Sequence, residues 1–192
     1  MSISEFVDIA DKLHESREVK GVTILFEYHD PLVHQAIRAL KFKGNQIVAK
    51  LLAEVLYENI IETLAEKIQF EKFYNPVFIP MPSSNKRKQE RGWNQCELVA
   101  VELAHLDIGK NFSIDTKSFI KNSYTETQVG KTRAERLHNL AGSFSVKNPD
   151  ALRDRNIILF DDVVTTGATM SEAKKTLLSA GARKIWCVAL AH

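Results

Sequence analysis

The segment Ile-Ile-Leu-Phe-Asp-Asp-Val-Val-Thr-Thr-Gly-Ala-Thr at residues 157–169 carries the clearest structural signal in the chain. Its four leading apolar residues predict a strand that is buried on both faces. Asp161 and Asp162 follow directly, and a loop of small, hydroxylated residues with Gly167 then leads into a helix. Because open α/β sheets bind ligands beyond the carboxyl ends of their strands, this segment predicts a ligand site.

The loop after the two carboxylates is suited to an anion. Gly167 lets the backbone approach a ligand closely, and the N–H groups of the loop and of the helix start can cradle a phosphate. Thr165, Thr166 and Thr169 add hydroxyl donors. The two carboxylates would then face a hydroxyl-rich group, a metal ion, or both.

A purely structural interpretation of the same segment is a threonine-capped helix start preceded by two solvent-facing aspartates. Two adjacent carboxylates at the end of a buried strand repel each other unless a ligand or a cation occupies the site, which favours a functional interpretation. The GxxxxGK[ST] spacing of P-loops and the GxGxxG fingerprint of dinucleotide-binding folds are both absent from the sequence.

The composition predicts one compact domain with a nearly balanced charge. The chain has 192 residues, of which 44% are hydrophobic. Its 26 Lys and Arg residues against 24 Asp and Glu residues give a net charge of +2, which argues against a general polycation that coats nucleic acid. Cys96 and Cys187 lack CxxC spacing, so we expect two buried thiols rather than a zinc site. No apolar run reaches membrane-spanning length and no secretory signal pattern is present, so we expect a cytoplasmic protein.

The rest of the sequence alternates between strand and helix patterns. Helices are expected at residues 4–14, 31–43, 46–69, 94–105 and 170–180. Strands are expected at residues 22–26, 76–80, 118–120, 157–160 and 185–190. The alternation predicts an α/β fold, with a mostly parallel sheet flanked by helices. Residues 1–70 are expected to form an N-terminal helical segment that packs on a core of residues 71–192.

Residues 157–167 resemble the phosphoribosyl pyrophosphate (PRPP) signature of type I phosphoribosyltransferases, because acids, hydroxylated residues and glycine occur in the same order. The loop that this resemblance assigns to the 5′-phosphate of PRPP comprises Thr165, Thr166, Gly167, Ala168 and Thr169. The resemblance also implies that Asp161 and Asp162 bind the ribose hydroxyls. It implies further that Mg²⁺ bridges the ribose and the pyrophosphate, and that a flexible hood loop covers the site.

Other segments are similar to the ComF/GntX branch of that family. They are Pro80-Met81-Pro82 with Arg91-Gly92-Trp93-Asn94-Gln95, the stretch 28–44 and the stretch 128–144. That branch often begins with a four-cysteine zinc module, which this sequence lacks, so the roles of that module do not carry over. The ComF name implies an accessory role in DNA uptake, with single-stranded DNA or competence-machinery proteins as partners, and the resemblance is compatible with a homodimer.

A polar, basic loop is expected at residues 83–92, after the strand at 76–80, and corresponds to the place where the family has its pyrophosphate loop. Its candidate residues are Ser83, Lys86, Arg87, Lys88 and Arg91. The three consecutive basic residues could equally form a solvated surface turn. Arg91 is a stronger candidate, because it lies beside Gly92 and a helix start at Asn94, which together form a second corner that can receive an anion.

The polar stretch 121–140 suits a mobile lid that closes over bound ligand. On such a lid Lys131, Arg133 and Arg136 would add positive charge around the pyrophosphate. A helix over residues 132–140 is an equally good interpretation of this stretch.

These observations predict Mg²⁺-dependent transfer of a 5-phosphoribosyl group from PRPP to an acceptor, with Asp161, Asp162 and Arg91 as catalytic residues. The sequence contains no recognisable residues for a particular base or other acceptor. A binding module that keeps a PRPP or nucleotide pocket without turnover is therefore a second interpretation. A third is direct contact of the basic segment and Trp93 with single-stranded DNA. The net charge gives this third interpretation little support, and we expect Trp93 to pack under the loop.

Overall fold

The structure is a computed structural model that describes residues 16–122 and 142–192. Its helices are α2 (Pro31–Lys43), α3 (Gln46–Glu71), α4 (Asn85–Arg91), α5 (Gln95–Leu106), α7 (Pro149–Leu152) and α8 (Ala168–Ser179). Its strands are β1 (Arg17–Val19), β2 (Val22–Phe26), β3 (Val77–Pro80), β4 (Ser113–Ile114), β5 (Phe119–Lys121), β6 (Phe144–Val146), β7 (Asn156–Val163) and β8 (Lys184–Ala191). The predicted helix at 4–14 and the predicted lid residues Lys131, Arg133 and Arg136 lie outside the described residues.

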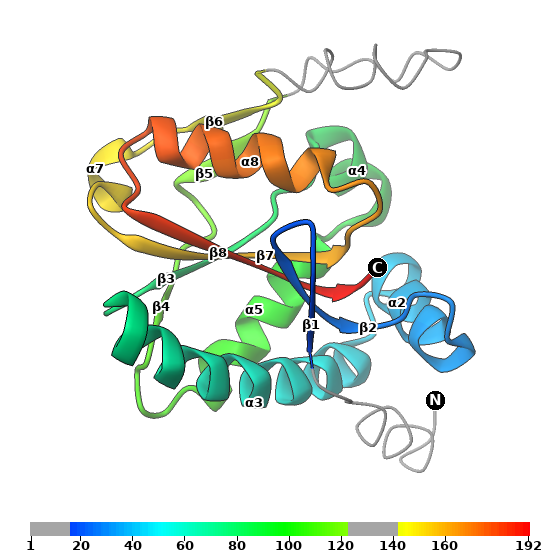
Figure 1. Cartoon of the computed structure of the whole chain (residues 1–192). Coiled ribbons are helices and arrows are strands. Elements are labelled where there is room, and N and C mark those ends of the chain that lie inside the picture. The colour runs from blue at the N-terminus through cyan, green and yellow to red at the C-terminus, as the bar shows by residue number, and fades with distance from the viewer. Residues whose placement is uncertain (1–15, 123–141) are drawn as a thin grey trace.

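A six-stranded sheet forms the centre of the molecule, with the order β1-β2-β8-β7-β3-β4 (Figure 1). Neighbouring strands run parallel except for the antiparallel pair β1 and β2. Helix α8 covers one face of the sheet, and α5 and α3 lie on the other (Figure 1). The predicted α/β architecture with a mostly parallel, helix-flanked sheet is therefore confirmed.

A small antiparallel ribbon of β5 and β6 lies outside the main sheet, against the face of α8 (Figure 1). Phe119 of β5 stacks on Phe144 of β6, with ring centroids 5.1 Å apart. The sequence predicted a strand at 118–120 but gave no sign of its partner β6. A strand of three residues is too short for its periodicity to be recognised.

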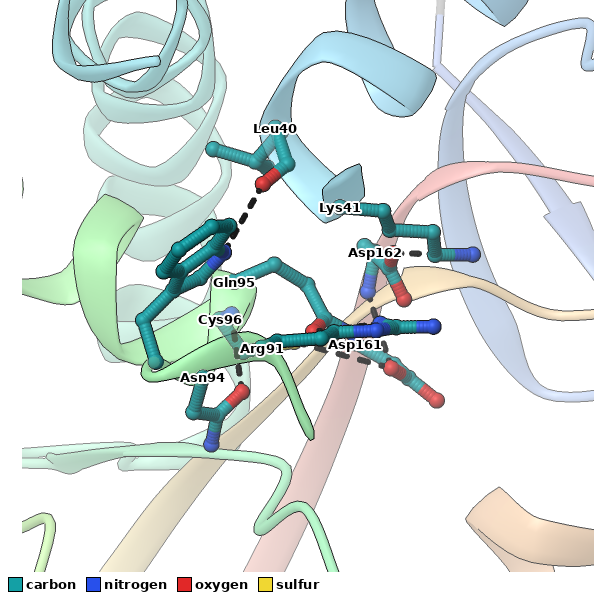
Figure 2. Close-up of polar contacts among 9 residues, drawn as sticks. Leu40, Lys41, Arg91, Asn94, Gln95, Cys96, Asp161 and Asp162 are labelled. Atoms are coloured by element: carbon teal, nitrogen blue, oxygen red, sulfur yellow. Dashed lines mark hydrogen bonds and ion pairs between the residues drawn. The ribbon is translucent and has the colours of Figure 1, made fainter. Parts of the chain in front are cut away.

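Helix α2 begins and ends where the sequence predicts. The Asp30 carboxylate accepts hydrogen bonds from the backbone N–H groups of Leu32 and Val33, and Pro31 occupies the first turn. Gly44 ends the helix in the left-handed conformation, with φ of 54°. These two ends fix the last turn of α2, which carries Lys41, beside the carboxyl edge of the sheet (Figure 2).

The expected loop at residues 83–92 is wrong, because this segment contains the helix α4. Ser84 caps the start of α4 by accepting a hydrogen bond from Arg87 N–H, and Gly92 ends it with φ of 85°. None of its residues is buried, so the segment has no apolar period from which a helix could be predicted.

The strand predicted at 157–160 is shorter than the observed strand, because β7 continues through both aspartates to Val163. Parallel pairing with β8 extends that far, with Asp161 opposite Ala189 and Val163 opposite Ala191. The carboxylates are therefore held by the sheet itself rather than by a loop. Such backbone pairing restricts where their side chains can lie.

Strands β1 and β2 join residues 17–26 to the same sheet as the rest of the chain. The boundary expected at residue 70 stays a prediction. Of the helices in residues 16–122 and 142–192, none combines the length and the apolar character that crossing a bilayer requires, not even the 26-residue α3.

Candidate functional site

Asp161 and Asp162 lie at the carboxyl end of β7, between β3 and β8. The side chain of Asp162 is buried and that of Asp161 is partly exposed. Asp161 Oδ1 accepts a hydrogen bond of 2.9 Å from the backbone N–H of Asp162. The simple alternative of two solvent-facing aspartates therefore does not describe this site.

Lys41 supplies the positive charge that the sequence analysis expected from a ligand or cation. Its Nζ lies 3.0 Å from Oδ2 of Asp162, as an ion pair (Figure 2). The contact is electrostatic rather than an aligned hydrogen bond, because this Oδ2 accepts none among the described residues. Lys41 was noted only as part of a segment similar to the ComF/GntX branch. Its role depends on the packing of α2 against the end of β7, which no local pattern reveals.

Asp161 has a different environment from its neighbour. Burial and the nearby charge of Asp162 raise the pKa of the Asp161 carboxyl well above its ordinary value. The Cys96 thiol lies 3.6 Å from Asp161 Oδ1, in the geometry of a hydrogen bond donated by the sulfur. Burial, followed by the charges of both aspartates, raises the pKa of Cys96 well above its ordinary value. The thiol therefore stays protonated and donates to the carboxylate.

Both cysteines are buried, as predicted. The sequence gave no sign that Cys96 touches the carboxylate pair. It lies in the first turn of α5, where Asn94 Oδ1 accepts a hydrogen bond from Cys96 N–H. The predicted helix start at Asn94 thus also positions the thiol.

The predicted phosphate loop follows β7 without interruption. Gly167 is the N-cap of α8, with φ of 79°, and offers no side chain to the free N–H groups of the first turn. Thr165 and Thr166 are exposed, while Ala168 and Thr169 are half-buried. The Thr166 hydroxyl lies 3.4 Å from Ala168 N–H. A helix start of this kind can receive an anion, because its N–H groups and its dipole are directed outward.

Arg91 lies at the end of α4 and extends toward the region of the two carboxylates (Figure 2). Its Nη1 donates to Gln95 Oε1 at 3.4 Å, and its guanidinium lies 5.1 Å from the ring centroid of Phe42. Two other helices therefore hold this half-buried cation in place. The predicted contact of Arg91 with the pyrophosphate of the substrate stays a prediction.

The other candidate residues for the pyrophosphate differ from one another in exposure and in contacts. The hydroxyl of Ser83 is buried and has no hydrogen-bond partner among the described residues. Lys86 and Arg87 are exposed on α4. Lys88 is engaged elsewhere, because its Nζ forms an ion pair of 2.9 Å with Glu97. An orphaned buried hydroxyl beside basic residues is the kind of group that a ligand oxygen would satisfy.

Lys121 on β5 is a further cation near the site that the sequence analysis missed. Burial and the charge of Arg87 lower the pKa of Lys121, and the charge of Asp161 opposes this effect. Its Nζ lies 5.4 Å from the ring centroid of Phe144. Its proximity to the site follows from the position of the ribbon next to α4, so spacing along the chain could not predict it.

A cavity of about 520 Å³ lies between α4, α5 and the β5–β6 ribbon. Its lining residues are Pro82, Ser83, Asn85, Lys88, Glu97, Thr116, Phe119, Ile120, Lys121, Asn122, Gly142 and Lys147. The cavity includes Ser83 and Lys121 but neither carboxylate, so it lies beside the predicted ribose site rather than at it.

Trp93 is packed, as expected, and is not free to stack on a base. Its indole N–H donates to the Leu40 carbonyl at 3.2 Å. Its ring lies so close to Gly44 that a Cβ there would be 2.9 Å from Trp93 Cε2. This packing weakens the interpretation of direct contact with single-stranded DNA, which depended on Trp93 as an aromatic platform.

The donor set around Asp161 suits a hard cation that is shared with a ligand. Cys96, Asp161 and Asp162 each have a ligand atom within 4.8 Å of the others. The thiol is protonated and Asp162 is paired with Lys41, so among these three groups Asp161 has the available oxygen. Mg²⁺ prefers oxygen ligands and keeps part of its shell for water or substrate, so it fits Asp161 together with ligand oxygens.

Comparison with known protein families settles the fold family. The model of the phosphoribosyl transferase domain matches residues 96–192, which include the carboxylate pair and the loop into α8. The chain belongs to the phosphoribosyl transferase family. Its expected place in the ComF branch is confirmed by curated relatives.

Competence protein F of Haemophilus influenzae is 31% identical to this phosphoribosyl transferase family member over 173 residues, which are 89% of this chain and 72% of the relative. Competence protein ComFC of Bacillus subtilis is 30% identical over 172 residues, covering 88% of this chain and 63% of the relative. DNA utilization protein YhgH of Escherichia coli is 28% identical over 160 residues, covering 82% and 65%. The chain thus spans 63% to 72% of the length of these relatives.

Solved structures with a similar arrangement include hypoxanthine-guanine phosphoribosyl transferase of L. donovani. That comparison has a TM-score of 0.43 and 14% identity, and covers 75% of this chain and 67% of the other. The allosteric regulatory enzyme of purine biosynthesis gives a TM-score of 0.41 and 16% identity, and covers 94% and 30%. These values are too low for any residue of those two proteins to be carried over to this chain.

Proposed function

We propose that this protein binds PRPP with Mg²⁺ at the carboxyl end of β7 and transfers the 5-phosphoribosyl group to an acceptor, with release of pyrophosphate. One observation carries the proposal. A partly desolvated carboxylate, Asp161, which forms no ion pair within residues 16–122 and 142–192, lies shortly before a glycine-capped helix start that is open to an anion. A ribose phosphate offers hydroxyl donors to the first group and a phosphate to the second.

The two aspartates would have unequal roles in ribose binding. Asp162 is already neutralised by Lys41, which keeps its position fixed. Asp161 has an unfavourable charge in the ligand-free protein, so hydroxyl donors would stabilise it most. The hydroxyls of Thr165 and Thr166 and the N–H groups of Ala168 and Thr169 would hold the 5′-phosphate around Gly167.

The departing pyrophosphate would meet the cations on the other side of Asp161. Arg91, held by Gln95 and Phe42, is the first of these. The cations Lys86, Arg87 and Lys121 are further candidates, together with the buried hydroxyl of Ser83, which has no partner among the described residues. When bound, Mg²⁺ would add further positive charge to the leaving group.

The chemistry proposed is a displacement at C1 of the ribose. The bond from C1 to the pyrophosphate oxygen breaks, a bond from C1 to the acceptor forms, and the acceptor loses a proton. The ring becomes positively charged in the transition state, so the enzyme works by positioning and charge stabilisation. Asp161 would stabilise the ribose cation, while Arg91 would stabilise the negative charge of the leaving group.

Calorimetric titration of PRPP in the presence of Mg²⁺ tests the site. Charge-assisted hydrogen bonds contribute about 1.5–3 kcal/mol each, so the double variant Asp161→Asn, Asp162→Asn should bind PRPP at least about 100-fold more weakly. The single variant Asp161→Asn keeps the Lys41 ion pair and should show most of this loss. Asp150→Asn, an exposed aspartate on α7, is the matched control. Equal affinity of wild type and the double variant would overturn the site.

A second candidate function is a PRPP-binding or nucleotide-binding regulator in DNA uptake, without turnover. The relatives are named competence and DNA utilization proteins, and competence-machinery proteins would then be its partners. Pyrophosphate release from PRPP with a panel of purines and pyrimidines separates the two candidates. Release with any of them supports transfer, whereas tight PRPP binding without release favours the regulator. The third interpretation, direct binding of single-stranded DNA, loses support from the packing of Trp93.

A further inference from the structure

The turn between β1 and β2 lies against the loop that leads into α8. Lys20 and Gly21 form this two-residue turn, and both have positive φ, 54° and 75°. Two such residues give a turn whose twist matches that of the flanking strands, so the tip of the hairpin is well defined. Figure 1 shows the hairpin at the edge of the sheet, with its tip directed toward the start of α8.

The hairpin is anchored independently of the loop that it approaches. β2 pairs in parallel with β8, and Arg17 of β1 forms an ion pair with Glu27 just after β2. The hairpin precedes residues 96–192, which match the family model, so Lys20 is not part of the family's matched domain.

Lys20 makes two contacts with the loop. Its Nζ lies 3.4 Å from the carbonyl oxygen of Thr166, which accepts the hydrogen bond. Its Cδ would be 3.7 Å from a Cβ placed on Gly167. The side chain of Lys20 therefore lies along the loop at the N-cap of α8, with its ammonium at the Thr166 carbonyl.

The charge of Lys20 has no carboxylate partner within residues 16–122 and 142–192. An ammonium has three N–H donors, and its one hydrogen bond to the described part of the chain, at Thr166, leaves two of them for another acceptor. Positive charge next to an anion-receptive helix start attracts the same ligand from a second direction.

We infer that Lys20 is a phosphate-binding residue, which the N-terminal hairpin contributes to the 5′-phosphate of the sugar. This inference rests on the proposed function and extends it to a residue outside the matched domain. The hairpin would then favour ligands with a phosphate monoester on the terminal carbon over the same sugar without one.

The test compares two probes, ribose 5-phosphate and inorganic pyrophosphate, by calorimetric titration. Lys20→Met keeps the length of the side chain and removes its charge. We expect it to bind ribose 5-phosphate about tenfold more weakly and pyrophosphate unchanged. Lys20→Arg should restore most of the affinity. Lys175→Met, which removes an exposed charge further along α8, should have no effect.

Salt separates a direct contact from a role in merely holding the loop. If Lys20 pairs with the phosphate, the affinity ratio of wild type to Lys20→Met should shrink between 50 mM and 500 mM NaCl, because screening weakens the pair. A ratio that stays constant would assign Lys20 only to positioning Thr166 and would overturn the inference. So would equal binding of ribose 5-phosphate by wild type and Lys20→Met.

The two proposals fail in different ways. If wild type binds neither ribose 5-phosphate nor PRPP, the proposed function and this inference are both wrong. If wild type binds both and Lys20→Met does so equally well, only the role of Lys20 is wrong.

Discussion

At the scale of single residues, the charge of Asp161 is unfavourable in the ligand-free protein but useful for binding a ligand. Burial and the neighbouring charge of Asp162 raise its pKa, which means that the ionised form destabilises the folded chain. Functional sites often contain such destabilising groups, because the binding of a ligand can offset the free energy that they cost the folded protein. The charge of Lys41, which forms an ion pair with Asp162, opposes this rise in the pKa of Asp161 but does not cancel it.

Asp161→Asn should therefore stabilise the ligand-free protein. Asparagine keeps an oxygen in place to accept the hydrogen bonds from Asp162 N–H and Cys96, and it carries no charge. We expect the free energy of unfolding at pH 7.5 to rise by about 0.5–2 kcal/mol. Urea denaturation measures this change, and Asp150→Asn serves as the control.

The same substitution should alter the dependence of stability on pH. With a raised pKa, folded Asp161 binds a proton at a pH where the unfolded chain has lost it. The free energy of unfolding of wild type should therefore increase as the pH falls through this raised pKa. Asp161→Asn should lack this increase, so the two proteins should become more alike toward acid pH. A stability gap that is constant from pH 7.5 to pH 5 would contradict the assignment.

At the scale of elements, the junction of α2 with the turn before α5 keeps the site together. Gly44 ends α2 with φ of 54°, and the Trp93 ring occupies the space where a Cβ would lie. Through this contact, the end of the helix that carries Lys41 packs against the segment that carries Arg91. The contact therefore links the two segments that carry the cations Lys41 and Arg91.

Gly44→Ala should destabilise the fold for two reasons. A left-handed conformation costs a residue with a Cβ about 1–2 kcal/mol, and the clash with Trp93 adds about 1–3 kcal/mol. We expect a total loss of about 2–5 kcal/mol, the sum of the two costs, measured as a lower urea midpoint with an unchanged slope. Gly92→Ala isolates the first cost, because Gly92 also ends a helix at positive φ but has open space around it. Equal losses in the two variants would rule out the clash.

The elements that the sequence predicted are those with long apolar patterns or distinct ends. Asp30 and Gly44 marked both ends of α2, and the apolar run before Asp161 marked β7. The elements that were missed have no such pattern. The helix α4 buries no side chain, and β1, β4 and β6 have two or three residues each. Their existence depends on the sheet or ribbon into which they pack.

At the scale of the whole molecule, the candidate site unites segments that are far apart in the sequence. The carboxylates and the loop into α8 could be predicted, because one continuous stretch encodes them. Lys20, Lys41 and Lys121 could not, because each reaches the site from another element through tertiary packing. Cys96 was predicted as an ordinary buried thiol for the same reason. The homodimer stays a prediction of the family resemblance, and the sequence identifies no acceptor.

This assembly from distant segments has a measurable consequence in hydrogen exchange. PRPP with Mg²⁺ should slow the exchange of amides in four separate stretches together, at residues 17–22, 38–44, 82–92 and 164–170. The ligand would bind the cations and N–H groups of all four stretches. At a free ligand concentration of about 100 times the dissociation constant, binding raises the free energy of unfolding by about 2.7 kcal/mol. Residues 66–75 are the internal control, because Lys184, at the opposite end of β8, contacts Glu71 there. Protection confined to 164–170 would show that the ligand uses the loop alone, and that the hairpin and the basic helix play no part in binding.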